Sequence, residues 1–167
     1  MRDARTSGAV TDQVVFQPGL SLQADPDLRP GGQFRSPAGR LLELEVAYAG
    51  AGQWIGLHVA LAGLNDLTGI TWVGLTSRHA APEELMIRVC LRSGVGNGPD
   101  AGFVDCFFDK HILSVPEPLN HVDALYTEAR QTLPETLPEI ASWRELVLFL
   151  PRQNFRWDLH DLRLFAV

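Results

Sequence analysis

The C-terminal stretch of the chain constrains its fold more than any other segment. Residues 145–167 read as two apolar runs separated by a turn at residues 151–154, and the last four residues are Leu-Phe-Ala-Val. Chain ends are usually polar and loosely held unless they are tied into the body of the protein. We therefore predict that the final run is a core strand and that the fold closes around it.

Alternating apolar residues recur in short segments along the rest of the chain. In residues 40–48, Leu42, Leu44 and Val46 alternate with two glutamates, which is typical of a strand with one buried and one wet face. Similar patterns predict strands at residues 13–17, 54–61, 69–76, 85–92 and 102–108.

Three segments follow other patterns. Residues 1–12 are predicted to be a loose lead-in, and residues 24–39, with three prolines and three glycines, a surface loop. Residues 121–130 fit a strand with Val122 and Tyr126 on one side, but they also fit a short helix. We favour the strand, because the neighbouring segments are all predicted to be β.

The spacing of these segments predicts an all-β fold. We count eight to ten short strands with turn residues between them, in a single domain over residues 13–167. The helical segments of ten to fifteen residues that a parallel α/β fold needs between its strands are absent from the pattern. An antiparallel sandwich or barrel is therefore expected.

Composition excludes several function classes. The net charge is −6, whereas a surface that follows nucleic-acid phosphates needs clustered lysine and arginine. No apolar run approaches the roughly 18 residues of a membrane span, and no apolar core of a signal peptide follows the N-terminus. We expect neither nucleic acid nor membrane as a partner, and we expect a cytoplasmic protein or one domain of a longer chain.

One predicted hairpin allows the faces of its strands to be assigned. Residues 85–92 and 102–108 flank a loop of turn residues, and one register sets Val89 opposite Cys106, Leu91 opposite Val104 and Ile87 opposite Phe108. A slip by one residue would bury the carboxylate of Asp105 against Leu91, which costs several kcal/mol. In the preferred register the two cysteines point to opposite faces, so no disulfide is expected between them.

The other face of this hairpin collects charged and aromatic side chains. It holds Arg88 and Arg92 beside Phe103, Asp105 and Phe107. This face is either a solvated surface with a salt bridge or a binding groove in which arginine and aspartate bind hydroxyl groups and a ring carries the ligand. Trp54 and His58 are in phase to lie on the same face of a neighbouring strand. The other tryptophans, Trp72, Trp143 and Trp157, are predicted to lie in or near the core.

Signatures of catalysis are missing from the sequence. The five histidines lack the spacing of a zinc site, the glycines of residues 94–98 lack the Lys-Ser/Thr of a phosphate loop, and there is no Gly-x-Ser-x-Gly elbow. No base partner is evident for either cysteine. We therefore predict no catalytic residue.

The C-terminal pattern resembles the end of carbohydrate-binding jelly rolls in the galactose-binding-like group. Trp143-Arg-Glu-Leu-Val-Leu-Phe-Leu-Pro151 reads as their apolar strand and turn, and Phe155-Arg-Trp-Asp-Leu-His-Asp-Leu-Arg-Leu-Phe165 as their final strand. The glycine-punctuated strands of residues 54–92 are similar as well. The resemblance implies an antiparallel two-sheet β-sandwich (jelly roll) that binds a sugar without cleaving it.

The resemblance also implies a structural calcium, because such modules often hold one through an acidic residue of the last strand. Asp161 is the matching position, but no N-terminal partner is apparent among Asp12, Asp25 and Asp27. No other cofactor is expected.

Our leading hypothesis is a lectin-like module that binds a saccharide or similar polar ligand through one sheet face. Its candidate contacts are Trp54, His58, Arg88, Arg92, Phe103, Asp105 and Phe107. Two alternatives stay open: a protein-interaction or structural accessory domain of a larger enzyme such as a glycosyltransferase, and a small β-sandwich enzyme.

Overall fold

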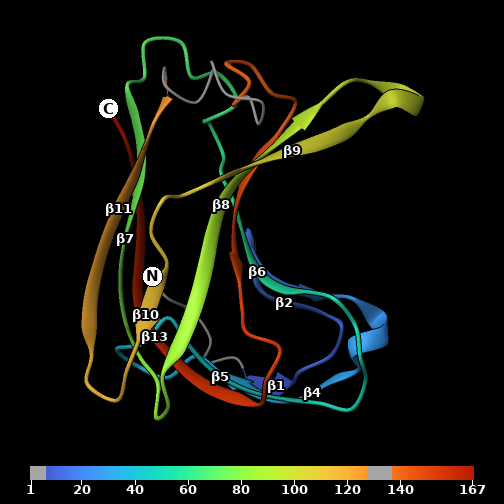
Figure 1. Cartoon of the computed structure of the whole chain (residues 1–167), viewed down its shortest axis with the longest axis vertical. Helices are drawn as coiled ribbons and strands as arrows, with labels where there is room; N and C mark the ends of the chain where they lie inside the picture. Colours follow the sequence, from blue (N-terminus) through green and yellow to red (C-terminus); the bar gives the residue numbers. More distant parts are fainter. Residues whose placement is uncertain (1–6, 128–136) are drawn as a thin grey trace.

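The chain folds into two antiparallel sheets that face each other across one hydrophobic core (Figure 1). The structure is a computed structural model and describes residues 7–127 and 137–167. Within these residues there are thirteen strands, so the predicted two-sheet β-sandwich is confirmed and its strand number is larger than expected. None of the helices in the described ranges is long and apolar enough to cross a membrane.

The first sheet has six strands. In spatial order they are β1 (Ser7–Ala9), β4 (Pro30–Arg35), β5 (Leu42–Tyr48), β13 (Phe155–Ala166), β7 (Trp72–Ala80) and β11 (Leu119–Tyr126).

The second sheet has seven strands. Six follow the order β10 (Ile112–Ser114), β8 (Leu85–Val95), β12 (Arg144–Phe149), β6 (Ile55–Ala60), β3 (Leu20–Ala24) and β2 (Gln13–Gln17). The seventh, β9 (Gly102–Phe107), also pairs with β8. Two short 3-10 helices, η1 (Pro26–Leu28) and η2 (Gly98–Asp100), lie in connections.

The C-terminal strand β13 is central to the six-stranded sheet, as predicted. It pairs with β5 on one side and with β7 on the other. Trp157 and Leu159 have no exposed surface, so the strand contributes directly to the core. Its register with β7 shifts between Leu159 and Asp161, and this bulge leaves His160 without a partner in the ladder.

The predicted faces of the β8–β9 hairpin are correct, but its predicted register is wrong by two residues. Leu91, not Val89, lies opposite Cys106, and Arg92 lies opposite Asp105. An apolar pattern with a period of two fixes which face is buried but cannot distinguish registers that differ by two. Here the turn sits one residue later than predicted, because β8 continues to Val95.

Four strands were not predicted, β1, β3, β4 and β10, and two of them, β1 and β4, lie in segments whose sequences look like loops. Residues 24–39 were expected to be a surface loop, yet β4 lies within them and pairs with β5. At Gly32, φ is +121°, and an added Cβ would lie 2.1 Å from the carbonyl oxygen of Glu45. The glycine therefore permits a close approach of two strands here, and it does not signal a turn. Ser7–Ala9, within the predicted lead-in, pairs with β4 as well.

The ambiguous segment at residues 121–130 is a strand as far as Tyr126. β11 covers Leu119–Tyr126 and pairs with β7 along its whole length. Residues 128–130 lie outside the described residues.

Candidate functional site

All seven predicted ligand contacts lie on the outer side of the seven-stranded sheet. The buried residues Leu85, Ile87, Val89 and Leu91 alternate with outward residues along β8, and β9 continues the pattern. We name this surface the β8–β9 face; its members are Trp54, His58, Arg88, Arg92, Phe103, Asp105 and Phe107, with Glu145 and Phe149 of β12. Trp54 and His58 lie on this surface, as their phase allowed, since their rings are 6.4 Å apart and His58 contacts Glu145. Their strand is not a direct neighbour of the hairpin, because β12 lies between β6 and β8.

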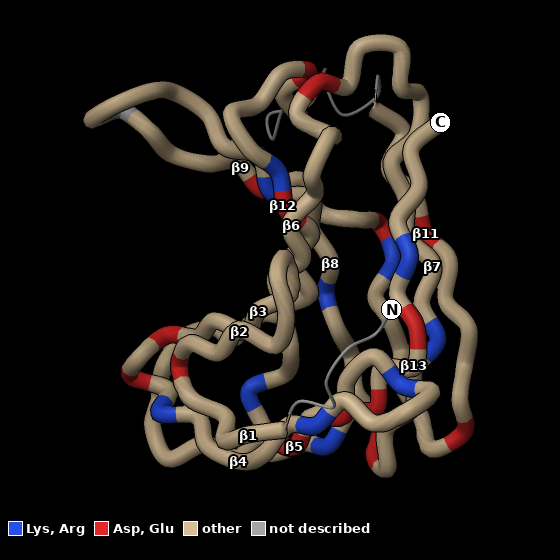
Figure 2. Tube along the Cα trace, turned by 180° about the vertical axis from the view of Figure 1, so that it is seen from behind, with Lys and Arg blue, Asp and Glu red and all other residues tan. Residues whose placement is uncertain are grey.

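A chain of polar contacts crosses the middle of the β8–β9 face. Arg92 donates from Nε and Nη2 to the two carboxylate oxygens of Asp105, at 2.7 and 2.8 Å. On its other side, Nη1 of Arg92 lies 3.7 Å from Oε1 of Glu145, and that oxygen is 3.0 Å from Nδ1 of His58. The chain links β9, β8, β12 and β6, and Figure 2 shows basic and acidic segments side by side near β9 and β12.

These charges are partly shielded from water. The exposed fraction is 14% for the Arg92 side chain, 20% for Asp105 and 19% for Glu145. The hydrogen bond to Asp105 raises the pKa of Arg92 above its ordinary value. A bidentate pair of this kind is rigid, so the outer atoms of these groups have fixed positions.

Aromatic rings flank the polar chain. The guanidinium carbon of Arg92 lies 4.1 Å from the ring centre of Phe103, and that of Arg88 lies 4.1 Å from the ring centre of Phe107. Phe107 and Phe149 are 6.0 Å apart. Phe103 keeps 52% of its surface exposed, so it can offer a ring to a ligand.

Two members of this face, Glu145 and Phe149, were not predicted. They lie on β12, where they alternate with the buried Leu146 and Leu148. The sequence indicated only an apolar strand here, and no face was assigned to its residues. The usable signal was Glu145 itself, since a carboxylate in such a run needs a charged partner on the same face.

The two cysteines lie on opposite faces of the sheet, as predicted. Cys106 belongs to the core, whereas Cys90 lies beneath the β8–β9 face. Burial, and then the nearby Asp105, raise the pKa of the Cys90 thiol far above its ordinary value. A thiol in this state is a poor nucleophile.

The surroundings of Asp161 do not fit the calcium ion that the resemblance implied. Its carboxylate accepts a hydrogen bond of 2.6 Å from Nε of Arg163, and Arg78 lies opposite it on β7. Two arginines disfavour a cation, and residues 7–127 and 137–167 contain no group of three or more His, Cys, Asp or Glu arranged to hold a metal.

Two tryptophans predicted to lie in or near the core are exposed. Trp157 is fully buried, but Trp72 and Trp143 are 42% and 41% exposed. Trp72 precedes the buried Val73 and is out of phase with the core side of β7. Trp143 lies over Gly94, where an added Cβ would be 2.4 Å from its Nε1.

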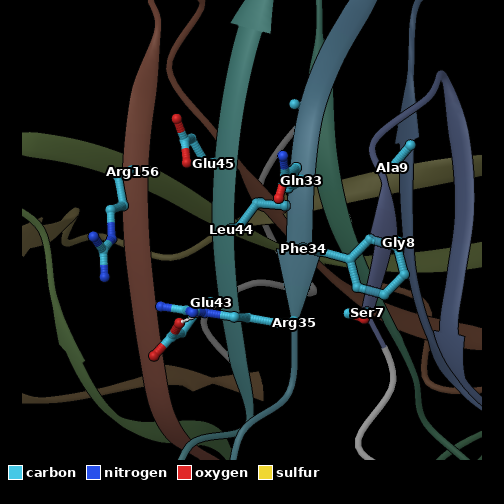
Figure 3. A pocket seen from close by; sticks show the side chains of 11 residues that line it. Ser7, Gly8, Ala9, Gln33, Phe34, Arg35, Glu43, Leu44, Glu45 and Arg156 are labelled. Atoms are coloured by element: carbon cyan, nitrogen blue, oxygen red, sulfur yellow. Dashed lines mark hydrogen bonds and ion pairs between the residues drawn. The ribbon is translucent and has the colours of Figure 1, made fainter.

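A hollow on the six-stranded sheet is another candidate site (Figure 3). It has a volume of about 720 Å³ and lies over β1, β4 and β5. Glu43 is bound by Arg35 and by Arg40, and the aromatic ring at the hollow, Phe34, is buried against Phe16. The hollow therefore lacks an exposed aromatic ring such as Phe103 on the β8–β9 face.

Comparisons with known proteins identify the fold. No family model and no curated protein sequence matches the chain. Among solved structures, a family 11 carbohydrate-binding module from Clostridium thermocellum, in complex with a β-1,3-1,4-mixed-linked tetrasaccharide, is 13% identical with a TM-score of 0.57. The match covers 98% of this chain and 97% of the module.

Two further structures show the same likeness. A CBM4 module is 18% identical with a TM-score of 0.50, over 90% of this chain and 96% of the module. Endoglucanase 3 of Trichoderma harzianum, from family GH12, is 10% identical with a TM-score of 0.52, over the full length of both chains. The chain thus has the jelly-roll sandwich of carbohydrate-binding modules, a fold that an endoglucanase also uses.

Proposed function

We propose that this chain is a non-catalytic carbohydrate-binding module that binds a saccharide on the β8–β9 face. One observation carries the proposal: a fixed row of hydrogen-bonding groups, Asp105, Arg92, Glu145 and His58, runs between exposed or half-exposed rings. The likeness to carbohydrate-binding modules supports it at the level of the fold.

The chemistry of this face suits a sugar. A pyranose ring presents apolar C–H groups on its flat faces and hydroxyl groups at its rim. Phe103 and Trp54 offer flat apolar surfaces, and the Arg92–Asp105 pair offers donors and acceptors in fixed positions. Because these groups are already ordered, binding would cost little side-chain entropy.

The charge balance of the face favours a neutral ligand. Two arginines, Arg88 and Arg92, stand beside two carboxylates, Asp105 and Glu145. The ligand therefore meets polar groups with no excess of either sign. A neutral saccharide fits this arrangement better than a phosphate or a nucleic acid.

The arrangement of the carboxylates supports a binding role over catalysis. A glycosidase uses two carboxyl groups that both face the scissile bond. Here Asp105 and Glu145 both contact Arg92, which lies between them in the sheet. Both carboxylates are therefore paired with the same arginine within the row.

A glycan array on the purified protein tests the proposal. We expect binding to a defined neutral saccharide, and loss of that binding in the double variant Arg88→Ala/Asp105→Ala. The matched control is Glu45→Ala/Arg156→Ala, an exposed pair of opposite charge on neighbouring strands of the other sheet, which should bind as the wild type does.

Three results would count against the proposal. Binding to no glycan by the folded protein would favour the interaction-domain alternative. Binding that survives Arg88→Ala/Asp105→Ala would place the saccharide elsewhere. Release of reducing sugar from the bound glycan would show that the module is an enzyme.

A further inference from the structure

A second aromatic surface lies on the opposite side of the molecule. Trp72 on β7 and Tyr126 on β11 are partners in the six-stranded sheet, and their ring centres are 5.0 Å apart with an angle of 35° between the planes. They are 42% and 37% exposed. Both point outward, because Val73 on β7 and Leu125 on β11 have no exposed surface and face the core.

A third ring continues this aromatic surface along β7. Phe165 of β13 lies opposite Gly74, and a Cβ added at Gly74 would be 2.1 Å and 2.6 Å from two carbons of the Phe165 ring. Only glycine therefore lets the ring lie across β7 at this point. Trp72, Tyr126 and Phe165 form one strip of rings on the outer side of the sheet.

The strip runs into a polar hollow of about 520 Å³. Thr76 and Arg78 of β7 line it together with Asn120 of β11 and the Asp161–Arg163 pair of β13. From Trp72 to Arg78, the strand extends about 20 Å at roughly 3.3 Å per residue. We name the strip and the hollow together the β7–β11 face.

The polar hollow carries an excess of positive charge. The carboxylate of Asp161 is bound by Arg163, whereas Arg78 makes no ion pair with the residues that the structure describes. A guanidinium group offers a planar fork of donors that matches a carboxylate. His160 lines the same hollow, and burial and the nearby Arg40 and Arg78 lower its pKa.

We propose that the β7–β11 face is a second binding surface, and that it takes an acidic oligosaccharide that carries uronic-acid carboxylates. The sugar rings lie on Trp72 and Tyr126, and a carboxylate further along the chain pairs with Arg78. Asn120 and Thr76 provide hydrogen bonds to hydroxyl groups between these ends.

The two faces differ in the ligand that they select. On the β8–β9 face, two arginines and two carboxylates balance, whereas on the β7–β11 face Arg78 is left over. They lie on the outer sides of opposite sheets and do not share residues. One molecule could therefore hold two different saccharide chains at once and link them.

Nuclear magnetic resonance can locate binding of a defined acidic probe. We would titrate the protein with tetragalacturonic acid and follow the indole N–H signals, each assigned by a Trp→Phe variant. We expect the signal of Trp72 to shift and the signal of Trp54, on the opposite sheet, to stay in place. Absence of any shift of Trp72 at millimolar probe would overturn the proposal.

Variants and a second probe test the residues and the charge separately. Trp72→Ala and Arg78→Ala should each weaken binding by about tenfold or more. Trp143→Ala, which removes an equally exposed tryptophan that lies over Gly94 of the other sheet, should leave binding unchanged. The carboxyl-reduced tetramer should bind at least about tenfold more weakly than the acid. Equal binding of both tetramers would show that the acidic class is wrong.

These results are distinguishable from those of the first face. If the array shows no neutral glycan but Trp72 responds to tetragalacturonic acid, the β8–β9 proposal fails and this one stands. If glycan binding on the array depends on Arg88 and Asp105, and the Trp72 signal does not respond to the acidic probe, the β8–β9 proposal stands and this one fails.

Discussion

The β8–β9 face and the β7–β11 face are built from the same kinds of residue but arrange them differently. On the β8–β9 face, Arg92 lies between Asp105 and Glu145, and the three side chains are mostly shielded from water. On the β7–β11 face, Arg163 and Asp161 form an exposed pair, and Arg78 stands beside them without an ion pair in the described part of the chain.

The difference shows that an arginine–carboxylate pair on a sheet can serve two purposes. Where the pair is shielded from water, removing one partner leaves the other charge uncompensated and poorly solvated. Such a pair therefore contributes to the stability of the fold as well as to a binding site. Where it is exposed, water replaces the partner at little cost.

Removal of Arg92, the central arginine of the β8–β9 face, should show most clearly that the arginines of the two faces differ in their contribution to stability. We expect Arg92→Ala to lower the free energy of unfolding by about 2–3 kcal/mol, because Asp105 and Glu145 lose their common partner while largely shielded. Arg163→Ala should change it by no more than about 0.5 kcal/mol, since that side chain is 77% exposed. Urea unfolding of both variants measures the difference, and similar values for the two would contradict the contrast.

The region beneath the β7–β11 face should make stability depend on pH. His79 is completely buried, and its Nδ1 forms a hydrogen bond of 2.8 Å with Oγ of Ser114. Burial, and then His121 and His160, lower its pKa to about 4. In the unfolded chain a histidine takes up its proton near pH 6.5, so the unfolded state binds more protons as the pH falls from about 6.5 to 4.

The folded state should therefore lose about 2 kcal/mol from this histidine between pH 7 and pH 5. The loss begins as the pH falls through the unfolded value and ends near the folded one. Urea unfolding at several pH values measures it, and His79→Gln, which retains a hydrogen-bonding group beside Ser114, should flatten the profile by that amount. An unchanged profile in His79→Gln would assign the pH dependence to other groups.

The faces of these strands could be predicted from the sequence, and their pairing could not. Alternation along β8 placed Arg88 and Arg92 on the outer side correctly. A salt bridge on this face was expected, but the residue directly opposite Arg92 was predicted wrongly, because registers two residues apart bury the same side chains. Only the position of the turn decides between them, and turn residues at 96–100 allow more than one position.

Contributions to the site from strands that are distant in sequence could not be predicted either. Glu145 completes the polar chain from β12, 40 residues after Asp105 and 53 after Arg92, and no local pattern connects them. Trp72 was assigned to the core because large aromatic residues are usually buried. Its position directly before Val73, which faces the core, is the local signal that it points outward.

A methyl group at Gly74 should disturb the β7–β11 face alone. We expect Gly74→Ala to lower the free energy of unfolding by about 1–2 kcal/mol, because the new Cβ meets the ring of Phe165 and the carbonyl oxygen of Asp123. The same variant should weaken the response of Trp72 to the acidic probe and leave neutral glycan binding intact. Gly102→Ala, where a Cβ meets no atom within 4 Å, is the matched control and should stay within about 0.5 kcal/mol of the wild type.

Among the variants expected to lose stability, Phe103→Ala should lose the least, yet it should abolish binding at the β8–β9 face. Phe103 is 52% exposed, and the guanidinium carbon of Arg92 lies 4.1 Å from its ring centre. An exposed contact of this kind contributes about 0.5–1 kcal/mol, so Phe103→Ala should remain folded and only slightly less stable. If Phe103 supports a sugar ring, the variant should nevertheless lose the array signal.

The control for this variant is Leu113→Ala, an exposed apolar residue of β10 in the same sheet. It removes apolar surface at a distance from the polar chain and should keep both stability and glycan binding. A Phe103→Ala variant that binds glycans normally would show that the ring only covers Arg92. In that case the exposed aromatic residue on this face would have the structural role that the shielded charges already have.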